Sequence, residues 1–290
     1  MPSVSPKITV IVVTHNSLPA LESCLTNLPE MSSDLSWELV VVDNASTDGS
    51  AEKSTELCPE AVVIANDRNS GFAAACNQGA AAAHGEYLLF LNPDVQPDAG
   101  SSEEMVAVLA AREKAGLVSA RLRNPDGSFQ ATSRRFPTIS NLLFSRRSVF
   151  HHLFGGAVDK RERYTLADFQ VITEVPAVAA AMVMVRKTLF DSLGGFDTRF
   201  FMYLEDTDLS LRVQEAGYIN LVVPSAGGIH FWGMGSATGE LRRGWLHHRS
   251  LWRYFLKHYP NGFSVFVLPL LLLANLLLAS ILPQRKTGEL

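Results

Sequence analysis

The chain has 290 residues, 47% of them hydrophobic, which is enough apolar material for one large core or two modest ones. Its 25 Lys and Arg residues against 29 Asp and Glu residues give a net charge of -4. This balance excludes a general nucleic-acid binder, because such proteins carry a basic excess. The three cysteines, Cys24, Cys58 and Cys76, form no CxxC pair, so they are interpreted as ordinary thiols of a reducing compartment and not as a disulfide framework or zinc site.

Residues 7–122 alternate short apolar runs, rich in Val, Ile and Leu, with helical stretches. The apolar runs lie at 8–14, 37–43, 61–66 and 86–92, and the helical stretches lie at 17–28, 48–57, 72–83 and 98–113. No small-residue cleavage site follows the first run, so we expect a buried strand there and not a signal peptide. Near-continuous apolar strands that alternate with helices predict an α/β fold with a Rossmann-like, mainly parallel sheet flanked by helices.

The second part of the chain is less regular. We expect two strands about a Pro-Asp-Gly turn within 117–135, a loop-rich insertion at 137–173, a buried strand at 174–187, a short helix within 188–197 that ends at glycine, a helix at 206–216 closed by Gly217, and a strand at 218–223. These elements extend the α/β domain to about residue 240.

Two segments after residue 240 have the composition of a membrane attachment. Residues 241–262 contain five Lys or Arg and no acidic residue, with aromatic side chains at helical spacing, which is typical of a basic amphipathic helix at a membrane surface. Residues 263–282 are twenty uncharged residues, the length that crosses a bilayer core. We predict that 263–282 anchors the protein, that 283–290 form a tail, and that the α/β domain faces the cytoplasm. The alternative is a basic helix docked on the core and followed by a buried apolar helix.

Three carboxylates crowd the stretch FFMYLEDTDLSLR. Glu205, Asp206 and Asp208 follow two phenylalanines, a methionine and a tyrosine. One interpretation is a helix start, where acidic side chains are stabilised by the positive end of the helix dipole. The other is a carboxylate that stays ionised at the edge of a pocket and accepts a proton as a general base. Asp208 lies four residues before Arg212, a spacing that favours an i,i+4 helix pair for this carboxylate.

Polar residues follow each apolar run of the first half. They are Thr14-His15-Asn16, Asp43-Asn44, Asn66-Asp67 and Asn92-Pro93-Asp94. Because ligands bind beyond the carboxyl ends of strands in open parallel sheets, these residues predict a binding site at one edge. Asp43 closes an apolar strand and needs a partner such as a base N–H or a ribose hydroxyl, and Asp94 suits a hard cation. His230, expected in a glycine-rich loop after the last strand, is placed to reach the same edge.

Six segments occur in the order found in family 2 glycosyltransferases. They are TVIVVTHNS, VVVDNASTDGS, NSGFAAACNQGA, LNPDV, GGFDTRFFMYLEDTDLSLR and IHFWGMGS. The chain resembles this family over roughly residues 7–258, and it is most similar to the bacterial rhamnosyltransferase-like branch. The resemblance implies a GT-A fold for a domain at 1–240, with residues 7–122 as the donor half and residues 174–240 as the acceptor half.

The resemblance also implies roles for individual residues. Those placed at the donor are Thr14, His15, Asn16, Asp43, Asn69, Gly71, Phe72, Asn77 and Asn92, with Asp43 at the nucleotide base. The family's DxD-type metal motif is reduced here to Asn92-Pro93-Asp94, so only Asp94 carries over as a metal ligand. His230 corresponds to a further metal or diphosphate contact. Asp206 corresponds to the catalytic base, and Glu205 to a neighbour that orients the acceptor or the base.

The implied activity is an inverting sugar transfer that depends on Mg²⁺ or Mn²⁺. The expected donor is a nucleotide-diphosphate sugar, dTDP-rhamnose or a UDP-sugar. The expected acceptor is a hydroxyl of a polyprenol-linked or cell-envelope glycan at the cytoplasmic face of a bacterial inner membrane. A nucleotidyltransferase on a similar sheet is one alternative, although it calls for a glycine-rich loop where this chain has THNSLPA. A non-catalytic, membrane-bound glycan-binding module is the other.

Overall fold

The computed structural model describes residues 6–138, 164–233 and 239–281. These residues form two compact units. The sheet unit comprises 6–135, 164–201 and 205–233, and the hairpin unit comprises 136–138, 202–204 and 239–281. The expected tail at 283–290 and most of the insertion expected at 137–173 lie outside the described residues.

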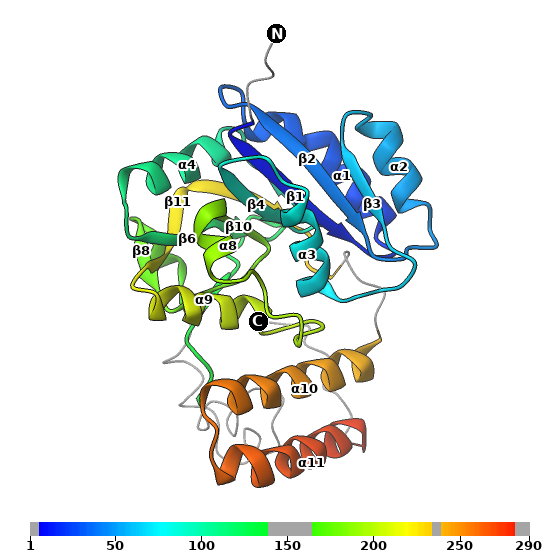
Figure 1. Ribbon diagram of the computed structural model, residues 1–290, viewed down its shortest axis with the longest axis vertical. Coiled ribbons are helices and arrows are strands. Elements are labelled where there is room, and N and C mark those ends of the chain that lie inside the picture. Colours follow the sequence, from blue (N-terminus) through cyan, green and yellow to red (C-terminus); the bar gives the residue numbers. More distant parts are fainter. Residues whose placement is uncertain (1–5, 139–163, 234–238, 282–290) are drawn as a thin grey trace. The chain divides into compact units, whose positions relative to one another are not determined.

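The first half of the sheet unit has the alternation that the sequence predicts (Figure 1). Its strands are β1 (Ile8–Thr14), β2 (Trp37–Asp43), β3 (Val62–Ala65) and β4 (Tyr87–Leu91), and its helices are α1 (Leu18–Asn27), α2 (Ser50–Leu57), α3 (Phe72–Ala81) and α4 (Ser101–Ala111), with a 3-10 turn, η1 (Leu28–Met31), after α1. These strands pair in parallel in the order β3-β2-β1-β4. Thr14 lies opposite Asp43, which lies opposite Ala65, so the residues that follow these strands meet at one edge.

The second half of the sheet unit is mixed in strand direction. Its strands are β5 (Val95–Pro97), β6 (Ala115–Arg123), β8 (Thr173–Val175), β10 (Met182–Arg186) and β11 (Ile219–His230), and its helices are α8 (Lys187–Ser192) and α9 (Glu205–Glu215), with a 3-10 turn, η2 (Leu166–Phe169). From β4 the sheet continues in the order β10-β6-β11-β5, and β8 also pairs with β11. β10 runs antiparallel to β4 and β6, whereas β11 runs parallel to β6. The α/β class is as predicted, but the parallel pairing is continuous only from β3 to β4.

Alternate side chains of the sheet build two apolar layers. Ile8, Val10 and Val12 of β1 pack in one cluster with side chains of α1 and α4. Ile11 and Val13 belong to the opposite cluster, which contains side chains of α3, α8 and α9. Helices therefore cover both faces, as near-continuous apolar strands require. It follows that α3 and α9, which carry candidate site residues, cover the same face.

The hairpin expected within 117–135 is largely absent from the described residues. Its turn forms, because Gly127 N donates to Asn124 O at 2.9 Å. After the turn, the chain forms only an isolated bridge between Arg123 and Phe129, and no extended strand forms at this point in the described residues.

The residues that follow this turn pair elsewhere. β7 (Ser133–Arg134) joins β9 (Ala177–Val178) in a separate antiparallel sheet. The single strand expected at 174–187 is consequently divided into β8, β9 and β10. Pro176 lies between β8 and β9, where its missing N–H interrupts a ladder.

His230 is part of a strand, which corrects the loop expected around it. β11 does not stop at 223 but continues to His230, which lies opposite Val95. A Cβ on Gly228 would lie 2.8 Å from Gln96 O, so glycine is what lets β5 approach this part of β11.

The hairpin unit contains α10 (Glu240–His258), a π-helical turn, η3 (Phe263–Val267), and α11 (Leu268–Ile281). The two helices lie side by side (Figure 1). Asn275 Nδ2 is 3.1 Å from His248 Nε2, and a Cβ on Gly244 would lie 3.2 Å from Leu276 Cδ1. The basic helix predicted at 241–262 is thus α10, closed into a hairpin by α11.

Residues 202–204 belong to the hairpin unit because α10 holds them. Ser250 Oγ donates to Met202 O at 2.7 Å. The rings of Tyr203 and His247 pack edge to face with centroids 5.8 Å apart. These contacts fasten the residues that directly precede α9.

The membrane-crossing helix expected at 263–282 is not formed by the described residues, among which no helix is long and apolar enough to cross a membrane. α11 has 14 residues, which gives a length of about 21 Å against a hydrocarbon core of about 30 Å. The residues before it form the η3 turn, and Pro269 lies in the first turn of α11, where proline is tolerated. The uncharged run is therefore divided between two elements.

Candidate active site

The loops that follow β1 and β2 are joined by hydrogen bonds. Asn16 N donates to Ser46 Oγ at 2.9 Å, and Asn16 Oδ1 accepts from Thr47 N at 2.8 Å. Each loop contains a left-handed residue, Asn16 with φ 52° and Ala45 with φ 64°, which turns the chain sharply away from its strand. The two strand ends therefore present one joined surface.

Asp43 and His15 each keep one buried polar atom that has no partner among the described residues. Asp43 is 3% exposed, and its Oδ2 accepts from Ser46 N at 2.9 Å, whereas its Oδ1 is unpaired. His15 Nδ1 is also unpaired, while Thr14 bonds within its loop to Ser17 Oγ at 2.7 Å. A buried polar group left without a hydrogen bond costs about 1–3 kcal/mol. These two atoms are thus where a polar ligand would find partners.

Asn44 was named in the sequence only as one of the polar residues at the strand ends, and the structure gives it a specific role. Its Oδ1 accepts from Ser70 N at 2.9 Å and from Asn66 Nδ2 at 3.2 Å. Its Nδ2 donates to Asn69 Oδ1 at 3.0 Å and to Gly71 O at 3.2 Å. This buried amide fixes the whole loop that carries the predicted donor contacts. Its position directly after β2 is the feature of the sequence that could have indicated this role.

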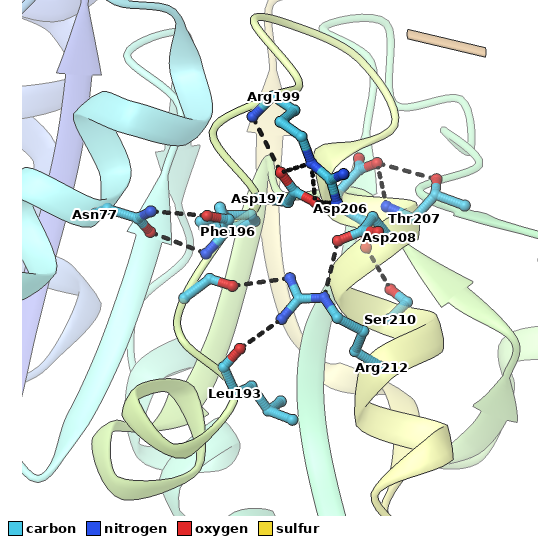
Figure 2. Close-up of polar contacts among 11 residues, drawn as sticks. Asn77, Leu193, Phe196, Asp197, Arg199, Asp206, Thr207, Asp208, Ser210 and Arg212 are labelled. Carbon is cyan, nitrogen blue, oxygen red and sulfur yellow. Dashed lines mark hydrogen bonds and ion pairs between the residues drawn. The ribbon is translucent and has the colours of Figure 1, made fainter. Parts of the chain in front are cut away.

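The start of α3 contacts the loop that precedes the acidic helix. Phe72 N donates to Phe201 O at 2.8 Å, and any side chain at Gly71 would collide with that carbonyl. Asn77 Nδ2 donates to Phe196 O at 2.8 Å, and Asn77 Oδ1 accepts from Phe196 N at 2.9 Å (Figure 2). The Asn77 amide therefore joins α3 to this loop through both of its polar atoms.

Asp94 and His230 meet where β5 begins and β11 ends. His230 Nε2 lies 3.2 Å from Asp94 Oδ1, and both residues are buried. His230 Nδ1 lies 2.6 Å from Gln130 Oε1, and the Gln130 amide is oriented by a 2.9 Å bond from its Nε2 to Asn124 Oδ1. The Gln130 carbonyl thus accepts the Nδ1 proton, so Nε2 is the ring nitrogen that lies beside the Asp94 carboxylate. Sequence reasoning missed Gln130, which lies 100 residues before His230 in the chain.

The ring nitrogen Nε2 of His230 and the carboxylate of Asp94 are side-chain groups that can bind one cation together. An imidazole whose second nitrogen is held by a carbonyl, together with a carboxylate, is a donor set for divalent metals. The part of the chain that the structure describes contains no group of three or more His, Cys, Asp or Glu side chains that could hold a metal. Mg²⁺ commonly takes one or two carboxylates and completes its shell with substrate phosphates and water. Asn92, the first residue of the reduced motif, uses its N–H to bond Ala181 O at 2.8 Å.

Asp206 and Asp208 begin α9 with different partners (Figure 2). Asp208 is fully buried, and its Oδ2 accepts from Arg212 Nε at 2.8 Å, which confirms the predicted helix pair. Asp206 Oδ2 accepts from Arg134 Nη2 at 2.8 Å, and its Oδ1 accepts from Thr207 N at 2.6 Å. The Asp206 side chain is 11% exposed, so of the two carboxylates only Asp206 reaches the surface. Arg134 was not anticipated from the sequence.

Glu205 is buried beside Asp206, and its Oε2 has no hydrogen-bond partner among the described residues. Burial first, and then the charges of Asp206 and Asp208, raise the pKa of Glu205 to about 8, so the carboxyl is protonated at neutral pH. The residues before it, Tyr203 with φ 70° and Leu204 with φ 63°, are both left-handed. Such conformations are costly in non-glycine residues and cluster at functional sites.

The predicted site residues form three contact groups. One surrounds Asp43 and the Asn44 network, the second is the pair of Asp94 and His230, and the third is Glu205 with Asp206. The backbone contacts of α3 connect the first group to the loop before the third. A carboxylate that reaches the surface, a donor set for a divalent metal and unpaired polar atoms at strand ends are components suited to the transfer of a group from a diphosphate.

The family model described as "Glycosyl transferase family 2" matches residues 9–194, the greater part of the chain. The "N-acetylglucosaminyl-diphospho-decaprenol L-rhamnosyltransferase" of Mycobacterium tuberculosis (strain ATCC 25618 / H37Rv) is 29% identical over 237 residues, which cover 76% of this chain and 75% of that protein. The "Rhamnosyltransferase WbbL" of Escherichia coli (strain K12) is 29% identical over 147 residues, which cover 50% of this chain and 52% of that protein.

Solved structures are similar over most of the chain. The mannosyltransferase PcManGT from Pyrobaculum calidifontis, in complex with GDP-Man and Mn²⁺, has a TM-score of 0.60 at 20% identity and covers 98% of this chain and 78% of that chain. GalNAc-T7 with UDP, GalNAc and Mn²⁺ has a TM-score of 0.64 at 16% identity and covers 90% of this chain and 49% of that chain. These likenesses confirm the GT-A-type fold. With that fold and the family match, the chain belongs to glycosyl transferase family 2 and is a glycosyltransferase.

Proposed function

We propose that this glycosyltransferase moves a rhamnosyl group from dTDP-rhamnose, with inversion, to a hydroxyl of a polyprenyl-diphosphate-linked glycan. The observation that carries the proposal is the Asp206 carboxylate, which is 11% exposed at the start of α9 and is held by Arg134 and Thr207. The choice of sugar and acceptor class is supported by the relative whose name joins L-rhamnose to a diphospho-decaprenol acceptor. Because a polyprenyl-linked acceptor would lie in a membrane, the reaction is proposed to take place at the cytoplasmic face of a bacterial inner membrane.

Asp206 is the proposed general base. In an inverting transfer the acceptor oxygen bonds to the anomeric carbon while the bond from that carbon to the diphosphate breaks, and the hydroxyl proton passes to the base. The helix N-terminus stabilises the ionised carboxylate. Thr207 N holds Oδ1 and Arg134 Nη2 holds Oδ2, so hydrogen bonds orient both oxygens of the proposed base.

Asp94 and His230 are the residues that would hold Mg²⁺ or Mn²⁺. The fit rests on the Gln130 carbonyl, which holds the Nδ1 proton of His230 and leaves Nε2 toward Asp94. When bound, such an ion supplies a Lewis acid that neutralises the leaving diphosphate. The diphosphate oxygens would complete a shell to which this chain contributes two side chains.

The end of β2 is the proposed nucleoside site. Thymine and uracil each carry a ring N–H, and Asp43 Oδ1 is a buried acceptor without a partner in the described chain. A donor from the base would satisfy it and recover the cost of the unpaired atom. The Asn44 network holds the neighbouring loop in place for the rest of the donor.

Transfer can be tested with dTDP-rhamnose, a short polyprenyl-diphosphate acceptor and Mn²⁺, with the anomeric configuration of the product read by NMR. The proposal expects an inverted rhamnoside and release of dTDP. A glycan-binding module would release no nucleotide diphosphate at all. A nucleotidyltransferase would instead release pyrophosphate from a nucleoside triphosphate, and either result would replace this proposal.

A further inference from the structure

α11 and the turn before it expose a row of large apolar side chains. Phe266, Leu270, Leu273 and Leu277 are 72%, 67%, 48% and 56% exposed. Their spacing of four, three and four residues places them along one side of a helix. Other sides of the helix pack inward, since Leu268 is buried and Leu276 lies close to Gly244 of α10. This row is therefore an outward face and not part of the core of the hairpin.

α10 adds aromatic and basic side chains to the exposed surface of the hairpin unit. Leu241 and Trp245 are more than half exposed. Arg242 and Arg249 are exposed as well, and Trp245 lies three residues after the first and four before the second, on the same side of the helix. Leucine, tryptophan and arginine presented together are characteristic of helices that lie in a membrane interface.

Charge separates this region from the rest of the chain. Residues 241–281 contain five Lys or Arg and no Asp or Glu, whereas the rest of the sequence has 20 basic against 29 acidic residues. An anionic lipid surface attracts such a cluster, at roughly fivefold in partitioning for each cation near the surface. A second copy of the same face would bring the same positive charges together, which opposes self-association through it.

We propose that the face formed by Phe266, Leu270, Leu273 and Leu277, with the basic residues of α10, binds in the plane of an anionic phospholipid surface. The described residues of α11, Leu268–Ile281, are too few to span a bilayer, but their apolar side suits shallow insertion with the helix axis parallel to the surface. The inference rests on the proposed function in one respect, because a polyprenyl-linked acceptor lies in the same bilayer.

Vesicle flotation of the full chain, without donor or acceptor, tests the proposal. Binding is expected to vesicles of phosphatidylcholine mixed with phosphatidylglycerol, to be weaker with phosphatidylcholine alone, and to fall as salt rises. Leu270→Glu/Leu273→Glu should lower partitioning at least about tenfold per residue, and Arg242→Gln/Arg249→Gln about fivefold per residue. Val171→Glu is the matched control, because Val171 is 70% exposed in the sheet unit and should bind as the unaltered chain does.

Thermal melting establishes that each variant folds, and Leu270→Ser/Leu273→Ser replaces the glutamate pair should that pair unfold. Equal binding by the unaltered chain and the folded α11 variant would overturn the proposal. So would a dimer in light scattering that the α11 variant converts to monomer while vesicle binding persists, since the face would then be occupied by a second copy. Because the assay contains no sugar donor, failure of the proposed transfer reaction would leave its outcome unchanged.

Discussion

Arg212 binds Asp208 and, at the same time, the loop that leads into α9. Its Nε donates to Asp208 Oδ2 at 2.8 Å, and its two terminal nitrogens donate to Leu193 O at 2.9 Å and Gly195 O at 2.8 Å (Figure 2). All three donor nitrogens are thus engaged, and Asp208 is fully buried. This arrangement fixes the start of α9 and gives Asp208 a structural role.

We therefore expect substitution of Asp206 to lower turnover and substitution of Asp208 to lower stability. Asp206→Asn keeps the shape of the side chain but cannot accept the proton, so turnover should fall at least about a hundredfold. Donor affinity should barely change, because the base meets the acceptor. Asp208→Asn should instead lower the free energy of unfolding by about 3–5 kcal/mol, the usual effect of breaking a buried pair.

Single-turnover rates, donor titration and thermal melts on both variants check this assignment. Arg212→Lys serves as a control, because it keeps the positive charge but cannot make the three hydrogen bonds of the guanidinium. It should therefore lower stability as Asp208→Asn does. If Asp208→Asn is the variant that folds normally and loses turnover, or if Asp206→Asn loses donor binding, the assignment is wrong.

Arg134 should act on turnover through Asp206. Removing a hydrogen bond to a charged group costs about 1.5–3 kcal/mol, so Arg134→Gln should lower kcat about tenfold or more at unchanged donor Kd. Arg134→Lys should recover part of the rate because it restores the positive charge 2.8 Å from Asp206 Oδ2. Arg135→Gln, a neighbouring exposed arginine, is the matched control. If Arg134→Gln instead weakened donor binding and left kcat unchanged, Arg134 would be a donor-binding residue.

Glu205 should make stability depend on pH. The folded carboxyl keeps its proton up to a pKa of about 8, whereas the unfolded one loses it near 4.5. Between these values the folded state binds more protons, so the free energy of unfolding falls as pH rises through this window. Glu205→Gln mimics the neutral form and should remove this fall.

Thermal melts of Glu205→Gln should match the unaltered chain near pH 4.5 and exceed it near pH 8. Each kcal/mol gained raises Tm by about 2–4 °C in a chain of this size class. The exposed residue Glu113 provides a control, since Glu113→Gln should shift Tm equally at both pH values. A Tm difference that grows toward acid would show that Glu205 is ionised in the folded protein.

The metal proposal predicts effects at Asp94 and at Gln130. Asp94→Ala should abolish turnover while the fold survives, and a chelator should do the same to the unaltered chain. Gln130→Ala removes the group that holds the His230 tautomer and should weaken Mn²⁺ binding about 10–100-fold. Calorimetry of Mn²⁺ binding in the presence of dTDP measures this independently of transfer. Full activity of Asp94→Ala in chelator would refute the site.

The parts of the fold that could be read from the sequence are those with local causes. β1 and β2 were predicted with the bounds observed because each is a continuous apolar run closed by a polar residue. The antiparallel direction of β10 could not be predicted, since a strand buried on both faces has the same composition in either direction. The pair at Gly227–Gly228 was interpreted as a loop, although glycine there serves close approach of β5.

The site residues divide in the same way. Asp94, Asp206 and His230 were proposed from the sequence because motifs carry them. Asn44, Gln130 and Arg134 act through partners that the chain brings together only by folding, such as the pair of Arg134 and Asp206, 72 residues apart. The number of uncharged residues at 263–282 likewise does not reveal that η3 ends at Val267 and α11 begins at Leu268.

The contact of α10 with residues 202–204 has a practical consequence. Ser250 Oγ bonds to Met202 O, and the Tyr203 ring packs against His247. Met202 directly precedes the left-handed residues Tyr203 and Leu204, which are followed by Glu205 and Asp206. A shortened protein that ends before α10 would retain every residue assigned to chemistry, yet the entrance to its acidic helix would have lost its support. Expression of the sheet unit alone should therefore not be read as a test of whether this chain is an enzyme.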